Sequence, residues 1–596
     1  MAINYINGKR IYYAFLAGAR EVTRNKADIN KINVFPVYDS DTGNNMAATL
    51  NYIVDTVSPS RYASETIHSL ADASLSGARG NSGIIMAQFI NGLSKDIGRQ
   101  KRLSTEDFGR SVVRAVPYAY SAVTNPVEGT MLTVLKDWAE AVHKLSKETN
   151  DFIHMLVESI KHAQQSLKET PEKLLLLKDA AVVDAGALGF VLFLEGVARL
   201  MQTGNLKAIL RDKAPPVTFE EPLEGITGDI DLRYCSEALI TGSEIDHSRI
   251  RQTVGKHGDS LIIAGTEQKT KIHIHTNHPE EFFFELLDHG TIIEQKVDDM
   301  LKQYQAVHQR NSNIALVTDS IADLPQEILD QYQVHMVPIN LEIEGSNFLD
   351  KVSVKPGQIF SILDSINEYP TSSQPSFKAV QQHLSFIGNH YESVIAITVS
   401  KELSGTWNVF NSVAETLREK GKKISVINSK TNSGAQGLLV LKAARMIAEG
   451  RGHDEIVCDI EQNIPDTKIF VSVATFKYMV RGGRVSPMKG FIANLLNFKP
   501  IVSLDEEGRG KAFANALSRK ANTLKILNIV KEIQDERPIS NYCIVHAGAP
   551  EKAETYKDLF TELLNKEPEF ITEISPIVAL NAGLGAVAVC IMSDQA

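Results

Sequence analysis

Apolar residues recur with a helical period through the first third of the chain. Segments such as Arg10–Asn25, Asp151–Glu169 and Ala187–Gln202 show this spacing, and almost no alternating β-branched run interrupts them. We therefore predict that residues 1–205 form an all-α domain.

The apolar pattern changes after this domain. A segment rich in proline and acidic residues, 214–222, predicts a linker. Residues 222–308 then mix strand and helix patterns, which predicts a small α/β domain. Its expected elements are strands at Tyr234–Ile240, Ser260–Gly265 and Lys271–Thr276, and a helix near Pro279–His289.

The last section, residues 313–596, alternates short buried strands with helical segments. This pattern is typical of an α/β domain with a parallel sheet. The expected strands are Ile314–Thr318, Val334–Ile339, Ser393–Thr398 and Lys423–Asn428.

Composition narrows the class of protein. The 596 residues are 43% hydrophobic and 22% charged, and the net charge of −10 comes without a Lys/Arg-rich run, so we expect no nucleic-acid partner. Neither a signal core nor an uninterrupted apolar run of about 18 residues occurs, so no integral membrane segment is expected. Four scattered cysteines do not form a disulfide framework, and a reducing cytoplasm is the expected location. They are Cys235, Cys458, Cys543 and Cys590.

The richest stretch in polar chemistry is residues 33–46. Asp39 and Asp41 stand two residues apart, just before a helical pattern that begins at Met46. Carboxylates this close repel each other unless a cation lies between them, and oxygen-only ligands favour Mg²⁺, which commonly accompanies phosphate. Asn33 would supply a third oxygen. The alternative is that Asp39, Ser40 or Asp41 simply caps the next helix.

Small-residue turns recur before other predicted helices. They lie at 76–83, 125–130 and 184–189, and the first contains three glycines and Arg79. Such turns let backbone N–H groups approach an anion at a helix N-terminus. Each turn alone is equally typical of an ordinary cap, and no Walker motif is present. Together with the two aspartates, they favour nucleotide phosphates and Mg²⁺.

Two further groups of polar residues lie in the later sections. His273 and His275 share one face of a predicted strand, and with Cys235 they would suit Zn²⁺; the alternative is surface or packing residues. In the third section, hydroxyl-rich loops at 317–325, 370–376 and 399–406 follow successive strands. They suit a carboxylate or a phosphate, although turn and cap residues look the same. No Ser-His-Asp arrangement is evident.

Residues 33–46, 77–83 and 184–189 resemble the nucleotide-binding domain shared by dihydroxyacetone kinase and bacterial fatty acid kinase. The resemblance implies a barrel of antiparallel helices with ADP and two Mg²⁺ ions at one end, the metal ligands being Asn33, Asp39 and Asp41. Ser40 and Tyr38 replace the family's glycine and proline. The implied nucleotide contacts are Thr42, Asn44, Asn45, Ser76, Gly77, Ala78, Arg79, Asn81, Ser82, Thr130, Asp184 and Gly186.

The remaining sections resemble two further families. Residues 232–290 are similar to the middle domain of bacterial fatty acid kinases, which implies a metal site at Cys235, His273 and His275. Residues 313–596, with the motifs 477–484 and 499–501, resemble the DegV family of fatty-acid-binding proteins. This second resemblance implies two α/β lobes around one long acyl chain. The implied head-group contacts are Ser372, Ser373, Ser404, Gly405, Thr406 and Arg484, with Asn581 where the family has histidine.

These resemblances predict a fatty acid kinase fused to its own acyl carrier, acting on ATP and a long-chain fatty acid with Mg²⁺. A homodimer and transient membrane contact are expected from the family. Two alternatives remain at this stage. One is a dihydroxyacetone (glycerone) kinase, and the other is a lipid-binding or regulatory protein with an inactive kinase domain.

Overall fold

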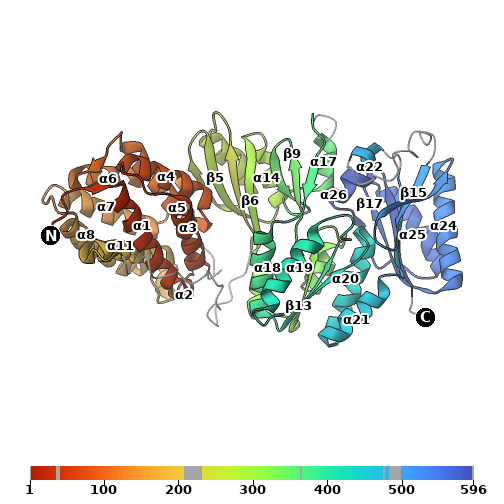
Figure 1. Ribbon diagram of the computed structural model, residues 1–596. Coiled ribbons are helices and arrows are strands. Elements are labelled where there is room, and N and C mark those ends of the chain that lie inside the picture. Colours follow the sequence, from red (N-terminus) through yellow and green to blue (C-terminus); the bar gives the residue numbers. More distant parts are fainter. Residues whose placement is uncertain are drawn as a thin grey trace. The chain divides into compact units, whose positions relative to one another are not determined.

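The computed structural model describes residues 2–34, 41–206, 231–362, 366–473, 477–481 and 499–593. The chain forms two compact units (Figure 1). Unit 1 contains Met1–His278 and Glu285–Leu301, and unit 2 contains Pro279–Phe284 and Lys302–Ala596.

The first part of unit 1 is a closed ring of helices. Each helix of the ring packs against the next in the order α1, α4, α5, α6, α7, α8 and α11, and α11 packs against α1. Helix α3 contacts α1, α4, α5 and α11. The predicted all-α domain, and the barrel that the family resemblance implied, are confirmed; among the described residues a two-stranded pair is added, β1 (Ile6–Asn7) and β2 (Arg102–Leu103). The helices are α1 (Gly8–Arg24), α2 (Lys26–Lys31), α3 (Thr42–Thr56), α4 (Ala63–Gly77), α5 (Gly80–Asp96), α6 (Thr105–Ala122), α7 (Met131–Leu145), α8 (Phe152–Lys168), α9 (Thr170–Lys173), α10 (Leu175–Asp179) and α11 (Ala185–Thr203).

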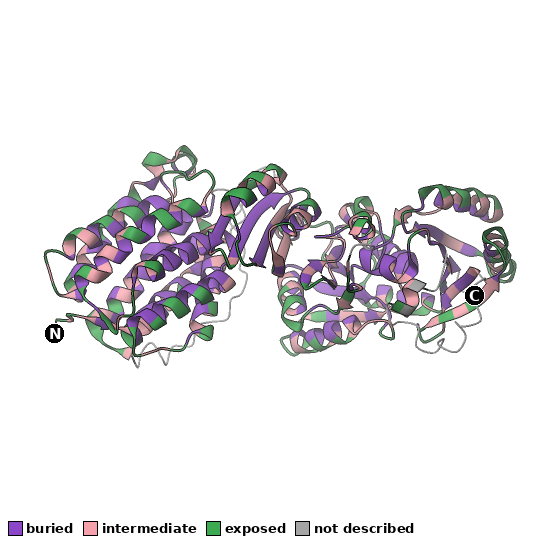
Figure 2. Ribbon diagram, turned by 90° about the horizontal axis from the view of Figure 1, so that it is seen from above, coloured by how far each residue is buried: buried purple, intermediate pink, exposed green. Residues whose placement is uncertain are grey.

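Amphipathic helices with defined caps build this ring. Ser104 and Asp107 form a capping box at the start of α6, and the Asp151 side chain caps α8. The apolar faces turn inward, as Figure 2 shows by the buried inner sides of the helices. At the centre, the Trp138 ring packs edge-to-face against Phe190, with ring centroids 5.5 Å apart.

Helix α11 is the most apolar of these helices. Among the described residues, Ala185–Thr203 alone is long and apolar enough to cross a membrane by length and composition, with a mean hydropathy of 1.3. More than half of it, 56%, is buried inside the structure. Burial against α1, α7 and α8 accounts for that composition, as expected of a core helix.

The second part of unit 1 is a four-stranded antiparallel sheet in the order β4-β5-β3-β6. The three predicted strands are present. Strand β6 was not predicted, because its side chains are largely half-exposed and show no clear apolar alternation. The sheet shares a small apolar cluster with the helical ring, in which Ile262 and Ala264 meet residues of α4 and α5. The elements are β3 (Tyr234–Thr241), α13 (His247–Val254), β4 (Asp259–Gly265), β5 (Lys269–Thr276) and β6 (Thr291–Asp299); most of α14 (Pro279–Leu286) and of α15 (Met300–His308) belongs to unit 2.

Unit 2 has two lobes. The first lobe is a parallel sheet, β13-β12-β7-β8, with a small antiparallel sheet, β10-β9-β11, beside it. The predicted parallel sheet is confirmed, although the expected strand Val334–Ile339 shortens to His335–Val337. The elements are β7 (Ile314–Asp319), α16 (Gln326–Gln331), β8 (His335–Val337), β9 (Asn340–Ile343), β10 (Ser346–Leu349), α17 (Pro356–Ile362), β11 (Thr371–Ser373), α18 (Phe377–His390), β12 (Ser393–Thr398), α19 (Thr406–Arg418), β13 (Lys423–Asn428), α20 (Ser433–Ala448) and α21 (His453–Asn463).

The second lobe is a six-stranded sheet in the order β16-β15-β14-β19-β17-β18. It is antiparallel except for the β17–β18 pair, and the short turn between β15 and β16 makes that pairing necessarily antiparallel. The elements are β14 (Thr467–Ser472), α22 (Lys477–Arg481), β15 (Lys499–Leu504), β16 (Gly510–Ala516), α24 (Arg519–Glu536), β17 (Ile539–His546), α25 (Pro550–Leu564), β18 (Ile571–Glu573), α26 (Pro576–Ala582) and β19 (Val587–Ser593).

Buried aspartates join the two lobes of unit 2. The Asp323 carboxylate pairs with Lys351 Nζ at 2.8 Å, and it accepts hydrogen bonds from Ser433 Oγ and the Ser575 N–H. Asp350 accepts from Ser320 Oγ at 2.7 Å and from the backbone N–H of Ile577 in α26 at 3.1 Å. Both carboxyl groups are fully buried, and each accepts one hydrogen bond from a backbone N–H of the second lobe, which favours keeping the lobes together.

The Asp350 carboxyl makes the stability of unit 2 dependent on pH. Burial raises its pKa to about 7, even though the Ser320 hydroxyl and the Lys351 charge lower it. The folded state therefore holds this proton more tightly than the unfolded chain, and the free energy of unfolding should fall between about pH 4 and pH 7 by up to about 1.4 kcal/mol per pH unit. Asp350→Asn should flatten this slope.

Urea unfolding at pH 5, 6 and 7 measures the effect. With only two tryptophans in the chain, a Trp138→Phe background leaves Trp407 to report on unit 2. Asp535→Asn, in the exposed part of α24, is the matched control. An equal pH slope in Asp350→Asn and in the parent would show that Asp350 does not titrate in this range.

Candidate functional site

The N-terminal ends of helices α3, α5, α7 and α11 meet in unit 1. A Cβ placed on Gly186 would lie 2.6 Å from Ser82 Oγ and 3.4 Å from Met131 Cβ, and one placed on Gly80 would lie 2.6 Å from Asn45 Nδ2. A side chain at either glycine would displace these neighbouring groups, and at Gly80 it would also be strained by the backbone angle φ of +60. The predicted turns around residues 42–45, 79–83, 130 and 184–186 are therefore brought together, and each offers helix N–H groups without intrahelical partners.

Helix α3 begins at Thr42, four residues before the predicted start at Met46. Polar residues occupy its first turn because Asn30 Oδ1 accepts hydrogen bonds from the Gly43 and Asn44 N–H groups, at 2.8 and 3.2 Å. Thr42 Oγ1 donates to Asn33 Oδ1 at 2.9 Å. Asn30 was missed in the sequence, because a polar residue inside the short helix α2 carries no local signal for this contact.

The structure describes one of the two predicted metal-binding aspartates, Asp41. Asp39, together with Tyr38 and Ser40, lies outside the described residues. Asp41 stands at the N-cap position of α3, and its side chain makes no cap hydrogen bond among the described residues. Capping, the alternative role, is therefore not what the Asp41 side chain does here. Asn33 is buried and bonded to Thr42, which places two of the three predicted magnesium ligands at this helix start.

The predicted loop 76–83 is much tighter than expected. Helix α4 ends at Gly77 and α5 begins at Gly80, so Asn81 and Ser82 lie in the first turn of α5. The Arg79 N–H donates to Thr49 Oγ1 at 3.0 Å, and the Gly80 N–H donates to Glu237 Oε1 at 2.8 Å. The Gly80 amide is thus occupied by a carboxylate of the neighbouring sheet.

Three residues of the predicted loop contact protein groups at the edge of this junction. Ser76 Oγ accepts from Lys269 Nζ at 2.7 Å, Gly77 packs closely against the Tyr52 ring, and Ala78 belongs to the apolar cluster shared with the sheet. These three contacts support the turn between α4 and α5, and the nucleotide contacts expected of Ser76, Gly77 and Ala78 stay predictions.

Polar atoms at this junction lack partners. Asn44 Oδ1 and Asn81 Oδ1 are buried and have no hydrogen-bond partner among the described residues. Buried polar atoms are rarely left unpaired, so both mark a place where a polar ligand fits. Asp184 caps α11 through the Ala187 N–H at 2.7 Å, and burial raises its pKa to about 6. Thr130 occupies the N-cap position of α7 and donates to the Val127 carbonyl.

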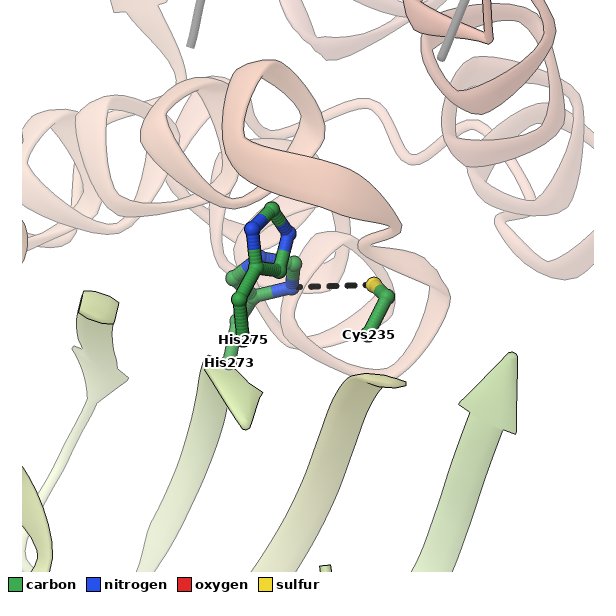
Figure 3. Close-up of side chains that lie close together, drawn as sticks. All are labelled: Cys235, His273 and His275. Atoms are coloured by element: carbon green, nitrogen blue, oxygen red, sulfur yellow. Dashed lines mark hydrogen bonds between the residues drawn. The ribbon is translucent and has the colours of Figure 1, made fainter. Parts of the chain in front are cut away.

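Cys235, His273 and His275 gather on one face of the β3–β5 pair (Figure 3). Their ligand atoms all lie within 4.8 Å of one another, and Cys235 Sγ is 3.9 Å from His273 Nδ1. Burial, then the His273 charge, lowers the pKa of His275 to about 3, so its imidazole is neutral, the form that binds metals. Burial and the Glu237 charge raise the pKa of the Cys235 thiol well above its usual range. His273 Nε2 is buried without a hydrogen-bond partner among the described residues.

Charged residues that sequence analysis missed surround this cluster. Glu237 Oε2 pairs with Lys271 Nζ at 3.1 Å, and Glu237 Oε1 lies 3.6 Å from His273 Nδ1. On the next strand, Lys296 pairs with Asp298. Charged residues inside a sheet are unusual, and the cluster Glu237, Lys271 and Lys296 was the available signal.

Unit 2 contains a cavity of about 480 Å³ between its lobes. Most of its wall is apolar and comes from β14, β15, β17, β19 and α26, including Val471, Leu504 and Ala588. Hydroxyl and amide side chains line another part of the wall, among them Ser372, Ser373, Gln374, Ser404, Asn432 and Asn581. The cavity therefore suits a molecule with a long apolar part and a polar group.

The structure brings most of the predicted head-group residues to this cavity. Ser372, Ser373, Ser404, Gly405 and Asn581 line it; Thr406 is fully buried behind Ser404, with 2.8 Å between their hydroxyl oxygens. Asn581 Nδ2 donates to the Ile577 carbonyl, and its Oδ1 is buried without a partner among the described residues. Arg484 lies outside the described residues.

Gln374, His546 and Asn432 line the same cavity and were not predicted. They come from segments separated by more than 50 residues, which only the tertiary fold brings together. The β15–β16 turn closes over the first lobe, where Ser400 Oγ donates to the Gly508 carbonyl and Arg509 pairs with Glu402 at 3.0 Å.

Three family models match successive parts of the chain. A DAK2 domain matches residues 36–199, the FakA-like middle domain of fatty acid kinase matches 231–307, and the model described as an uncharacterised protein of the DegV family matches 313–594. The chain thus combines a kinase-type DAK2 domain with a DegV-family domain. These three matches fall on the sections in which the sequence motifs predicted them.

Relatives by sequence include uncharacterised proteins of Staphylococcus aureus strains USA300 and NCTC 8325. Each is 33% identical over 323 residues, which is 52% of this chain and 59% of the relative. The chain therefore spans less than two thirds of the length of the relatives it matches.

Similar solved structures include a fatty-acid-binding DegV family protein of Thermus thermophilus (27% identity, TM-score 0.44) and DegV, a fatty acid binding protein of Bacillus subtilis (26%, 0.43). The first match covers 47% of this chain and 99% of the other, and the second covers 48% and 100%.

The close approach at Gly43 can be tested by stability. A Cβ at Gly43 would overlap the Lys26 carbonyl and lie 2.8 Å from Asn30 Oδ1. Because a backbone carbonyl cannot move aside cheaply, Gly43→Ala should lower the free energy of unfolding of unit 1 by about 1–3 kcal/mol. Gly98→Ala, where nothing lies within 4 Å of the new Cβ, should change it by less than about 0.5 kcal/mol.

Urea denaturation in a Trp407→Phe background, followed by Trp138 fluorescence, reports on unit 1 alone. Equal stability of the Gly43→Ala and Gly98→Ala variants would contradict the packing described for the start of α3.

Proposed function

We propose that this protein is a fatty acid kinase that carries its own acyl-binding domain. It transfers the γ-phosphate of ATP to the carboxylate of a fatty acid and releases acyl phosphate and ADP. The observation that carries the proposal is the combination, in one chain, of a kinase-type DAK2 domain whose helix N-termini converge and a largely apolar cavity with a polar wall.

The reaction needs little proton chemistry. A fatty acid carboxylate is already ionised near neutral pH, so its oxygen can attack the γ-phosphorus directly while the bond to the bridging oxygen of ADP breaks. The protein has to position the two reactants and to balance the charge of the phosphates. In this proposal the N–H groups of Asn81 and Ser82 in the first turn of α5 face the phosphates, together with Arg79 and the positive ends of the α3, α7 and α11 dipoles.

Residues at the start of α3 fit a magnesium site. Asn33 and Asp41 offer oxygen atoms there, and Asp39 is the third expected ligand. Mg²⁺ prefers such oxygen ligands and, when bound, neutralises phosphate charge. The proposal assigns Thr42, Asn44, Asn45, Asn81, Ser82, Thr130, Asp184 and Gly186 to the surroundings of the nucleotide.

In unit 2, we assign the apolar part of the cavity to the acyl chain and the hydroxyl-bearing part to its carboxylate. Ser373 and Ser404 would donate hydrogen bonds to the carboxylate, and the start of α19 adds a favourable dipole. The match of residues 313–594 to the DegV family, which the hydroxyl-rich loops resemble, motivates this assignment. Covalent linkage would raise the effective concentration of the carrier for the kinase domain.

The cluster of Cys235, His273 and His275 is a candidate Zn²⁺ site. One sulfur and two imidazoles are a common zinc donor set, and ligand atoms within 4.8 Å of one another need only small movements to reach bonding distances of about 2.0–2.3 Å. A fourth ligand could be water. Zinc content of the purified protein, and its loss in His273→Ala, tests this assignment.

Two other functions remain as alternatives. A glycerone kinase would share the DAK2 domain but would use dihydroxyacetone as acceptor. A lipid-binding or regulatory protein would bind fatty acid without turning over ATP. The homodimer, the cytoplasmic location and transient membrane contact are further predictions of the fatty acid kinase hypothesis.

One assay separates these functions. The full chain is incubated with Mg·ATP and oleate, palmitate or dihydroxyacetone, and acyl phosphate is trapped as the hydroxamate by hydroxylamine. Hydroxamate formed only with fatty acids supports the proposal. Turnover with dihydroxyacetone alone would favour the glycerone kinase, and bound lipid without any turnover would favour the binding protein.

Asp41→Ala should reduce acyl phosphate formation at least 100-fold, because it removes a ligand of the proposed Mg²⁺, while fatty acid binding stays unchanged. Asp55→Asn, an exposed residue of the same helix α3, is the control and should keep full activity. Hydroxamate yield and fluorescent fatty acid titration measure the two properties. Loss of both in Asp41→Ala would contradict the division of labour between the domains.

Ser404→Ala should weaken binding of a fluorescent fatty acid about 3- to 10-fold, because one hydrogen bond to an ionised group contributes roughly 1 kcal/mol or more. The Kd of the corresponding methyl ester should hardly change. Ser412→Ala, on the exposed side of α19, serves as the control. If the acid and its ester weaken equally, Ser404 does not contact the carboxylate.

A further inference from the structure

Glu237 connects the sheet of unit 1 to the turn that begins α5. The residue is 1% exposed, and its Oε1 accepts the Gly80 N–H at 2.8 Å. Gly80 has φ +60 and is the first residue of the helix whose start lies at the proposed phosphate site. The Arg79 N–H is held separately by Thr49 of α3. The turn is therefore anchored from two sides, and Glu237 is the anchor on the sheet.

The Glu237 carboxylate is itself held in place by charge. Lys271 Nζ lies 3.1 Å from Oε2, and that side chain is only 7% exposed. Glu237 lies in β3 and Lys271 in the neighbouring antiparallel strand β5. The residues directly opposite Glu237 are His273 in β5 and Lys296 in β6. The Glu237 carboxylate therefore has the Lys271 ammonium on one oxygen and the Gly80 N–H on the other.

A carboxylate beside a phosphate site would normally repel the ligand. Here the Lys271 ammonium balances its charge, so the Gly80 amide can be fixed without adding net negative charge to the junction. The N–H groups that follow in the first turn of α5 have no carbonyl within the helix to bond. Fixing Gly80 sets the direction in which these groups point.

We propose that Glu237 is a positioning residue of the nucleotide site, which holds the Arg79–Gly80 turn in the conformation that binds phosphate. It acts as an acceptor for the Gly80 N–H and does not itself contact the nucleotide. This inference rests on the proposed nucleotide site in unit 1.

Two double variants separate the acceptor from the ion pair. Glu237→Gln with Lys271→Gln removes both charges but keeps a carbonyl oxygen that can accept from Gly80. Glu237→Leu with Lys271→Met removes the acceptor as well, and an apolar pair usually replaces a buried ion pair without loss of folding. Glu294→Gln, on the exposed side of β6, is the surface control.

Two readouts apply to the full chain. Hydrogen–deuterium exchange of the peptide around Gly80 should be at least tenfold faster in the Leu/Met variant and close to the parent in the Gln/Gln variant. The Kd of Mg·ADP, measured by calorimetry, should rise at least tenfold in the Leu/Met variant and by less than about twofold in the Gln/Gln variant. Thermal unfolding shows whether each variant is folded.

The outcomes separate this inference from the proposed function. Equal rates of hydrogen–deuterium exchange at Gly80 in the two double variants would overturn the anchoring role, regardless of the Kd of Mg·ADP. Faster exchange with an unchanged Kd for Mg·ADP would overturn the link to nucleotide binding. Absence of Mg·ADP binding by the parent chain would count against the proposed function, while exchange at Gly80 would still test the anchor.

Discussion

The organisation of unit 1 depends on how closely the backbones of its helix N-termini approach one another. At Gly43, Gly80 and Gly186, a single added carbon would enter the space of a neighbouring carbonyl, amide or hydroxyl group. This constraint brings α3, α5 and α11 together at their positive ends, where the helix dipoles favour an anion. Wider spacing would admit side chains and separate the groups on which the proposed phosphate site depends.

Buried charges have comparable roles in both units, because each connects elements that are distant in sequence. Glu237 of β3 forms an ion pair with Lys271. It also accepts a hydrogen bond from the Gly80 N–H at the start of α5, 157 residues away in the sequence. Asp323 joins the first lobe of unit 2 to the Ser575 N–H, 252 residues away. An unpaired buried charge is costly, so these contacts hold only in the assembled fold. They therefore make the geometry of each candidate site dependent on the whole unit.

Much of the architecture could be predicted from periodicity and motifs. The helical ring follows from the 3.6-residue spacing, and the parallel sheet of unit 2 from short buried strands between helices. Boundaries were less predictable. The start of α3 was misplaced because Asn30, in the separate helix α2, supplies the acceptor for its first turn. Strand β6 was missed because its half-exposed side chains show little apolar alternation.

Local patterns in the chain are enough to identify the chemical groups of the candidate sites: the aspartates near residue 40, the small residues before the helices, the Cys/His/His set and the hydroxyl-rich loops. Capping, strand alternation and turn chemistry act over a few residues, so short spacings carry this information. The folded chain is needed to show that Ser76 contacts Lys269, that Gly80 donates to Glu237, and that Gln374, Asn432 and His546 share the cavity of unit 2. Such contacts arise from packing between distant segments, and no local pattern encodes which of them will meet.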